Sequence, residues 1–112
     1  MAVLKIMNIL FVCSRNQWRS PTAEAIFNKS QLHTARSAGT SDSARVKISQ
    51  KLVDWADIIF VMERRHKEII AARFNTNKKI IVLDIPDEYG YMDDELVAMI
   101  KSSVTPHLGD PF

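Results

Sequence analysis

Short apolar runs alternate along the chain with stretches in which apolar residues recur every three or four positions. The runs have the length of strands buried on both faces of a parallel sheet, and they occupy residues 6–12, 32–38 (the weakest), 56–62 and 79–83. The periodic stretches are typical of helices with one apolar face, and they occupy residues 21–28, 48–55, 64–74 and 93–105, with Pro106 expected to end the last. Strand and helix alternate four times, which predicts an α/β fold: a single three-layer domain, residues 1–112, with a four-stranded parallel sheet.

The composition narrows the class of protein. With 46% hydrophobic and 25% charged residues, the chain is an ordinary globular domain, large enough to fold around its own core. A net charge of +2 is too small to indicate nucleic-acid binding, and no apolar stretch reaches membrane length, so we expect neither partner. We interpret the apolar opening, residues 1–7, as part of the fold. Cys13 is the only cysteine, which excludes an internal disulfide and indicates a reducing, cytoplasmic location.

The stretch from Cys13 to Ser20, CSRNQWRS, joins the first predicted strand to the first predicted helix. Backbone N–H groups in such a loop can turn inward, and the helix N-terminus adds partial positive charge, so a phosphate-sized anion is stabilised there without a metal. The same field favours the thiolate of Cys13, the nucleophilic form of cysteine. Arg19 is placed to bind two phosphate oxygens. Ser20 is placed to cap the helix, with Pro21 at the first helical position, and also to donate to the thiolate.

This arrangement, Cys-x5-Arg-Ser-Pro directly after the first strand, resembles the phosphate loop of the low-molecular-weight protein tyrosine phosphatases. Three further segments fit the family's pattern in order, so that the resemblance covers most of the chain: residues 37–40, 56–62 and 86–89. The resemblance implies hydrolysis of phosphotyrosine in proteins, or of small aryl phosphates, through a cysteinyl-phosphate intermediate, with inorganic phosphate as product and no metal or other cofactor. It assigns phosphate binding to Ser14, Arg15, Asn16, Gln17, Trp18, Arg19 and Ser20.

The phenolate that leaves in such a reaction needs a proton from a general acid. The resemblance places the acid in the segment 86–89, which makes Asp87 the first candidate, with Asp84 and Glu88 as alternatives. Asp110 begins an Asp-Pro-Phe sequence similar to the family's acid motif. It follows the last predicted helix, however, whereas the family's acid loop precedes that helix, so we set Asp110 aside.

Three positions of the loop depart from the family's pattern. Arg15 stands where the family usually has glycine, so Arg15 must accept an ordinary backbone conformation or a strained one. Trp18 stands where many members have a second cysteine, so oxidised Cys13 would have no internal thiol to pair with. Gln17 differs from the small hydroxyl residue of members that act on phosphoarginine, which favours phosphotyrosine.

The resemblance also makes predictions about the surroundings of the loop. Asn16 matches the family's asparagine, a residue type that tolerates the left-handed backbone conformation, and we expect it to bond toward Ser37 or Ser43. Trp18 and Tyr89 are assigned to the wall of the substrate pocket, which Tyr91 could extend. For Trp18 a position covering the core is an equally good interpretation.

Charged residues and histidines elsewhere give weaker signals. The cluster 63–68, ERRHKE, is interpreted as the solvated face of a helix rather than as a docking surface for acidic partners. His33, His66 and His107 fall in different predicted elements, which argues against a metal site or a Cys–His pair.

Two other functions remain open from the sequence. An arsenate reductase shares this loop, but its cycle would need an external thiol because Cys13 is alone. A non-catalytic module that binds phosphopeptides or other anions would keep the anion site without turnover, and Arg15 in place of glycine is the feature that keeps this alternative open.

Overall fold

The computed structural model describes residues 6–30 and 32–109. Strands and helices alternate in the predicted order: β1 (Asn8–Cys13), α1 (Arg19–Ser30), β2 (Thr34–Gly39), α2 (Gln50–Trp55), β3 (Ile58–Val61), α3 (Arg64–Arg73), β4 (Lys79–Val82) and α4 (Asp94–Leu108). Two of the expectations, the inclusion of residues 1–5 in the fold and the position of Asp110, lie outside the described residues.

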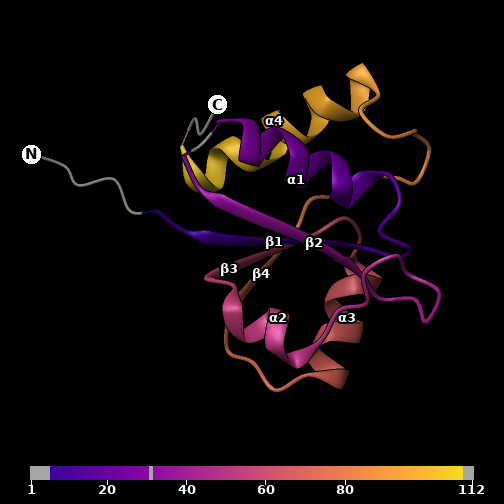
Figure 1. Cartoon of the computed structure of the whole chain (residues 1–112), viewed down its shortest axis with the longest axis vertical. Coiled ribbons are helices and arrows are strands. Elements are labelled where there is room, and N and C mark those ends of the chain that lie inside the picture. Colours follow the sequence, from indigo (N-terminus) through magenta and orange to yellow (C-terminus); the bar gives the residue numbers. More distant parts are fainter. Residues whose placement is uncertain (1–5, 31, 110–112) are drawn as a thin grey trace, which may run out of the picture.

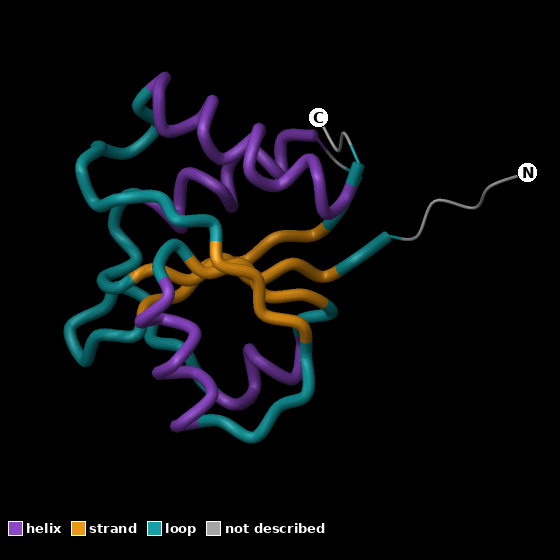
Figure 2. Tube along the Cα trace, turned by 180° about the vertical axis from the view of Figure 1, so that it is seen from behind, coloured by secondary structure: helices purple, strands orange, loops and turns teal. Residues whose placement is uncertain are grey.

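The four strands form one parallel sheet in the order β2-β1-β3-β4. Helices α1 and α4 cover one face of this sheet, and α2 and α3 cover the other (Figure 1; Figure 2 shows the same layers from behind). The predicted α/β fold with a four-stranded parallel sheet is therefore confirmed. The chain reverses its direction of winding between β1 and β3, and ligands of open α/β sheets bind beyond the carboxyl ends of the strands at such a point.

The central strand β1 supplies side chains to both halves of the core. Ile9, Phe11 and Cys13 point into the layer beneath α1 and α4, while Leu10 and Val12 point into the layer beneath α2 and α3. This alternation is the two-residue period of a strand that is covered on both faces. It places Cys13 at the carboxyl end of a strand held rigidly on both sides.

Two helix boundaries differ from the predictions. Helix α1 begins at Arg19 rather than at Pro21, so Ser20 lies in the first turn and does not cap the helix. Helix α4 continues through Pro106 to Leu108 and ends at Gly109, whose φ of 74° suits glycine. Proline removes one helical hydrogen bond, but Leu108 still packs against the core, and this packing keeps the last turn helical.

None of the helices in the described ranges has both the length and the apolar character needed to cross a membrane.

Candidate active site

The loop between β1 and α1, residues 14–18, is held from behind by the segment that follows β2. Four carbonyl groups of the β1–α1 connection accept hydrogen bonds from this segment: Cys13 O from Thr40 N (3.0 Å), Ser14 O from Ser41 N (2.9 Å), Arg15 O from Arg45 N (3.0 Å) and Asn16 O from Arg45 Nε (3.2 Å). In a trans peptide the N–H group points away from the carbonyl oxygen. The N–H groups of residues 14–17 therefore face away from this segment and toward the pocket, as an anion-binding loop requires.

Gly39 allows this close approach. A Cβ atom at this position would lie 2.4 Å from Ser14 O and 2.7 Å from the Cβ of Ala44, so any larger residue would push the loop and its backing segment apart. The segment 40–46 is polar and joins β2 to α2. The structure shows that it fixes the direction of every peptide at the start of the phosphate loop.

The Cys13 side chain is 3% exposed and sits among hydrogen-bond donors. Its Sγ lies 2.9 Å from Ser20 Oγ and accepts from the backbone N–H of Asn16 at 3.3 Å. The Nδ2 group of Asn16 donates to Ser20 Oγ at 2.9 Å, so the single hydroxyl hydrogen of Ser20 has two acceptors within reach, Cys13 Sγ at 2.9 Å and the carbonyl oxygen of Ala38 at 3.4 Å. These contacts hold the sulfur in one position at the carboxyl end of β1.

Asn16 adopts the left-handed conformation, with φ of 57°, which asparagine tolerates better than most residues. Its expected bond to Ser37 or Ser43 is wrong, because Ser37 donates instead to Glu24 at 2.6 Å and Ser43 pairs with Ser41 at 3.0 Å. Arg15 is not among the residues with positive φ, so the position that usually holds glycine in the family is accommodated here without that strain.

Arg19 lies beneath the pocket and is 2% exposed. Its Nη1 contacts the carboxylate of Glu63 at 2.6 Å and donates to the carbonyl oxygen of Ile85 at 2.8 Å, and its Nε lies 3.7 Å from Asp87 Oδ1. Burial opposes ionisation of Glu63, but hydrogen bonds from Arg19 and Arg65 prevail and lower the pKa of Glu63. The buried guanidinium is thus paired and fixed in direction, as burial of a charge demands.

His66 supports the loop from a second side. The ring is fully buried; its Nδ1 accepts from the backbone N–H of Glu63 at 3.1 Å, so Nε2 carries the proton and donates to Ser14 Oγ at 2.9 Å. Burial first, and then the charge of Arg19, lower the pKa of His66 to about 4. The ring is therefore neutral at pH 7.

Glu63 and His66 correct the interpretation of residues 63–68 as a solvated helix face. Arg64, Arg65, Lys67 and Glu68 are exposed, but Glu63 and His66 turn inward to Arg19 and Ser14. A signal was available: Glu63 lies in the short connection after β3 and His66 in the first turn of the next helix, and side chains that follow parallel strands meet at the same sheet edge. The run of charged residues in the helix led instead to its interpretation as a solvated face.

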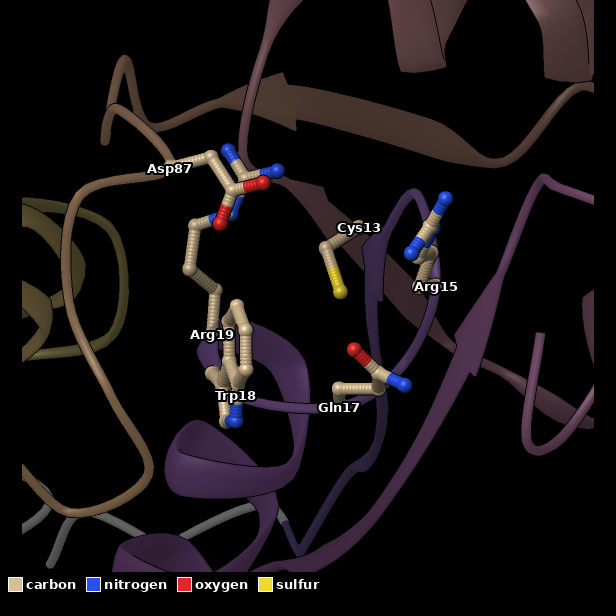
Figure 3. A pocket seen from close by; sticks show the side chains of 6 residues that line it. All are labelled: Cys13, Arg15, Gln17, Trp18, Arg19 and Asp87. Carbon is tan, nitrogen blue, oxygen red and sulfur yellow. Dashed lines mark ion pairs between the residues drawn. The ribbon is translucent and has the colours of Figure 1, made fainter.

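A pocket of about 110 Å³ opens above these groups, lined by Cys13, Arg15, Gln17, Trp18, Arg19 and Asp87. Figure 3 shows Asp87 beside the Arg19 guanidinium at one side of the opening, with Arg15 on the far side of Cys13 from Trp18. The Asp87 side chain is 52% exposed. Asp84 and Glu88, the alternative acids, are also exposed, but neither lines this pocket.

The two aromatic residues assigned to the pocket wall behave differently. Trp18 lines the pocket and is 47% exposed. Tyr89 packs instead against the core layer beneath α1 and α4 and does not line the pocket, while Tyr91 is exposed. The described residues contain no group of three or more histidine, cysteine, aspartate or glutamate side chains placed to hold a metal ion.

Comparisons with known proteins agree with this geometry. A family model described as low molecular weight phosphotyrosine protein phosphatase matches residues 8–51, which include β1, the phosphate loop and β2. The low molecular weight protein-tyrosine-phosphatase PtpB of Staphylococcus aureus is 29% identical, with 84% of this chain and 94% of that protein aligned. The protein-arginine-phosphatase of Bacillus subtilis is 32% identical over 61% of this chain, and the alignment spans 63% of that relative's length.

Among solved structures, the arginine phosphatase YwlE from Geobacillus stearothermophilus superposes with a TM-score of 0.73 at 25% identity, covering 91% of this chain and 92% of the other. The chain therefore has the fold of these small α/β phosphatases. It is similar to the low molecular weight phosphotyrosine protein phosphatase family over residues 8–51, and to a named member over most of its length.

The buried neutral state of His66 predicts a specific loss of stability in acid. The unfolded chain takes up a proton on this histidine below pH 6.5, whereas the folded chain does so only near pH 4. The contribution of His66 to the free energy of unfolding is thus complete above pH 6.5 and is lost as the pH falls toward 4, by about 3 kcal/mol in total. Urea unfolding of the wild type and of His66→Gln at several pH values checks this. Equal pH slopes for the two proteins would contradict a buried neutral His66.

Proposed function

We propose that the chain hydrolyses phosphotyrosine in proteins, or small aryl phosphates, with Cys13 as the nucleophile. The observation that carries the proposal is the buried thiol of Cys13, which accepts from the N–H of Asn16 and contacts Ser20, in a loop whose carbonyl groups at residues 13–16 are all bonded to the segment behind it. Such a loop stabilises the phosphate dianion in the substrate and the charge that develops on its oxygens in the transition state.

In the first step the Cys13 thiolate attacks phosphorus, the bond between phosphorus and the aryl oxygen breaks, and that oxygen takes a proton from Asp87. In the second step the Asp87 carboxylate takes a proton from water. The water oxygen attacks phosphorus, the P–S bond breaks, and inorganic phosphate leaves with the thiolate restored. Ser20 donates to the sulfur when it departs, and the Arg19 fork binds two of the phosphate oxygens.

Asp87 is assigned as the acid because it lines the pocket on the side of Arg19, while Asp84 and Glu88 do not line it. Glu63 is excluded from this role by its contacts, because its carboxylate is bound to Arg19 and Arg65 and is held in the ionised form.

The choice of phosphotyrosine rests on Gln17 and Trp18. Both line the pocket, and the exposed Trp18 ring offers a flat apolar surface against which a phenyl ring can pack. In members of the family that act on phosphoarginine the residue after the loop asparagine is a small hydroxyl residue, and Gln17 does not match it. The relatives include one protein named as an arginine phosphatase and one named as a tyrosine phosphatase, so the substrate must be tested directly.

A turnover panel tests the proposal. Wild-type protein is expected to release phosphate from p-nitrophenyl phosphate and from phosphotyrosine peptides, but not from phosphoserine or phosphoarginine peptides. Cys13→Ser should abolish release while still binding inorganic phosphate, because the serine hydroxyl is a far weaker nucleophile in the same site. Preferential release of phosphate from phosphoarginine peptides would contradict phosphotyrosine as the substrate. Turnover that survives in Cys13→Ser would contradict the cysteinyl-phosphate intermediate.

The role of Asp87 gives a second prediction. Asp87→Asn should lower kcat for a substrate with a poor leaving group by about 100-fold or more, the usual contribution of a general acid. Binding of inorganic phosphate should change little, because the N–H groups and Arg19 remain. The neutral substitutions Asp84→Asn and Glu88→Gln, in the same loop, are matched controls expected to retain wild-type kcat. If one of these controls shows the large loss and Asp87→Asn does not, the acid is elsewhere.

A further inference from the structure

A second depression adjoins the pocket on the Arg15 side. This groove, of about 520 Å³, is lined by Ser14, Arg15, Thr40, Ser41, Arg65, Ile69 and Asp87. It shares Arg15 and Asp87 with the pocket, so the two hollows meet at these side chains. Figure 3 shows Arg15 on the far side of Cys13 from Trp18, and neither Trp18 nor Gln17 lines the groove.

The side chains of this groove have unused capacity to bind an anion. Arg15 is exposed, and its guanidinium makes no hydrogen bond or ion pair with any residue in the described ranges. Arg65 is 58% exposed and engages Glu63 through Nη2. The one carboxylate that lines the groove, Asp87, is paired with Arg19 at 3.7 Å. Two guanidinium groups with free donors thus face a single carboxylate that already has a partner.

We propose that this groove binds a carboxylate side chain of the protein substrate, from an aspartate or glutamate close to the phosphorylated residue and on one side of it. The proposal rests on the proposed phosphatase function. A substrate chain whose phosphorylated side chain enters the pocket has to leave across the rim, and on the Arg15 side it meets Arg15 and Arg65. The planar guanidinium fork suits a planar carboxylate. Arg15 thereby gains a role in selecting substrates at a position where the family usually has glycine.

The test compares kcat/KM for three phosphotyrosine peptides. One carries aspartates only before the phosphorylated residue, one carries them only after it, and the third has asparagine at all these positions. Wild-type protein should favour one of the two acidic peptides about fivefold over the neutral peptide and should treat the other acidic peptide as neutral, an effect of the size that exposed ion pairs provide. The preference should shrink as salt is raised.

Three variants test which residues produce the preference for the acidic peptide. Arg65→Gln should reduce the preference to about twofold or less, within the range of a single exposed pair; only the ratio between peptides is used for this variant, because Arg65 also donates to Glu63, the partner of Arg19. Arg15→Gln should reduce the preference likewise; only the ratio between peptides is used for it, because Arg15 belongs to the phosphate loop. Arg64→Gln removes an equal charge from the neighbouring exposed position of α3, which does not line the groove, and should keep the full preference.

The outcomes separate the two proposals. Turnover of all three peptides at the same kcat/KM would support the phosphatase function and contradict the proposal that the groove binds a carboxylate of the substrate. An equal preference for acids on both sides, or an equal loss in Arg64→Gln and Arg65→Gln, would also overturn it, since either result indicates a diffuse positive field. Absence of turnover on any phosphotyrosine substrate would overturn the proposed function and the groove's role with it.

Discussion

The hydrogen bonds that draw four successive carbonyl groups away from the pocket are the constraint on which the rest of the site depends. Peptide planarity means that turning the carbonyls of residues 13–16 toward the segment 40–45 turns the following N–H groups the other way. The proposed anion site would therefore be built by the backbone and would need few particular side chains in the loop. This explains how Arg15 and Trp18 are accommodated at positions where the family usually has glycine and often has cysteine.

The site also contains buried charges, and each buried charge needs partners that offset its loss of hydration. Arg19 can lie 2% exposed because Glu63, the carbonyl of Ile85 and Asp87 surround it. Glu63 also caps the N-terminus of α3. Its backbone N–H donates to Nδ1 of His66 and so fixes the tautomer of the ring, and Nε2 of His66 donates to Ser14 Oγ. The site is thus assembled from the carboxyl ends of β1, β2, β3 and β4. The parallel sheet brings together residues as distant in sequence as Cys13 and Asp87, so a displaced strand end would change the surroundings of Cys13.

The sequence was sufficient for the parts that depend on local pattern. Apolar runs predicted the four strands, and the spacing of Cys13, Arg19 and Ser20 after β1 predicted one loop that holds all three, where Cys13 contacts Ser20 and lines one pocket with Arg19. Features that depend on tertiary contacts were missed. Pro106 was expected to stop α4, but packing of Leu108 carries the helix onward. The inward contacts of Glu63 and His66 were not predicted. Both residues lie in a run of charged residues, and such a run does not show which of its members turn toward the protein interior. Tyr89 was assigned to the pocket wall by resemblance, but it packs against the core layer beneath α1 and α4.

The most direct test of this account is a titration with inorganic phosphate followed by the backbone amide resonances. The account predicts saturable shifts of the amides of residues 14–19 in the wild type and in Gly90→Ala, where a Cβ meets nothing within 4 Å. In Gly39→Ala, where the Cβ would strike Ser14 O, the remaining resonances report folding and the affinity should fall about tenfold or more, that is by about 1.4 kcal/mol. Shifts confined to other residues, or unchanged affinity in a folded Gly39→Ala protein, would contradict the claim that the backing segment creates the anion site.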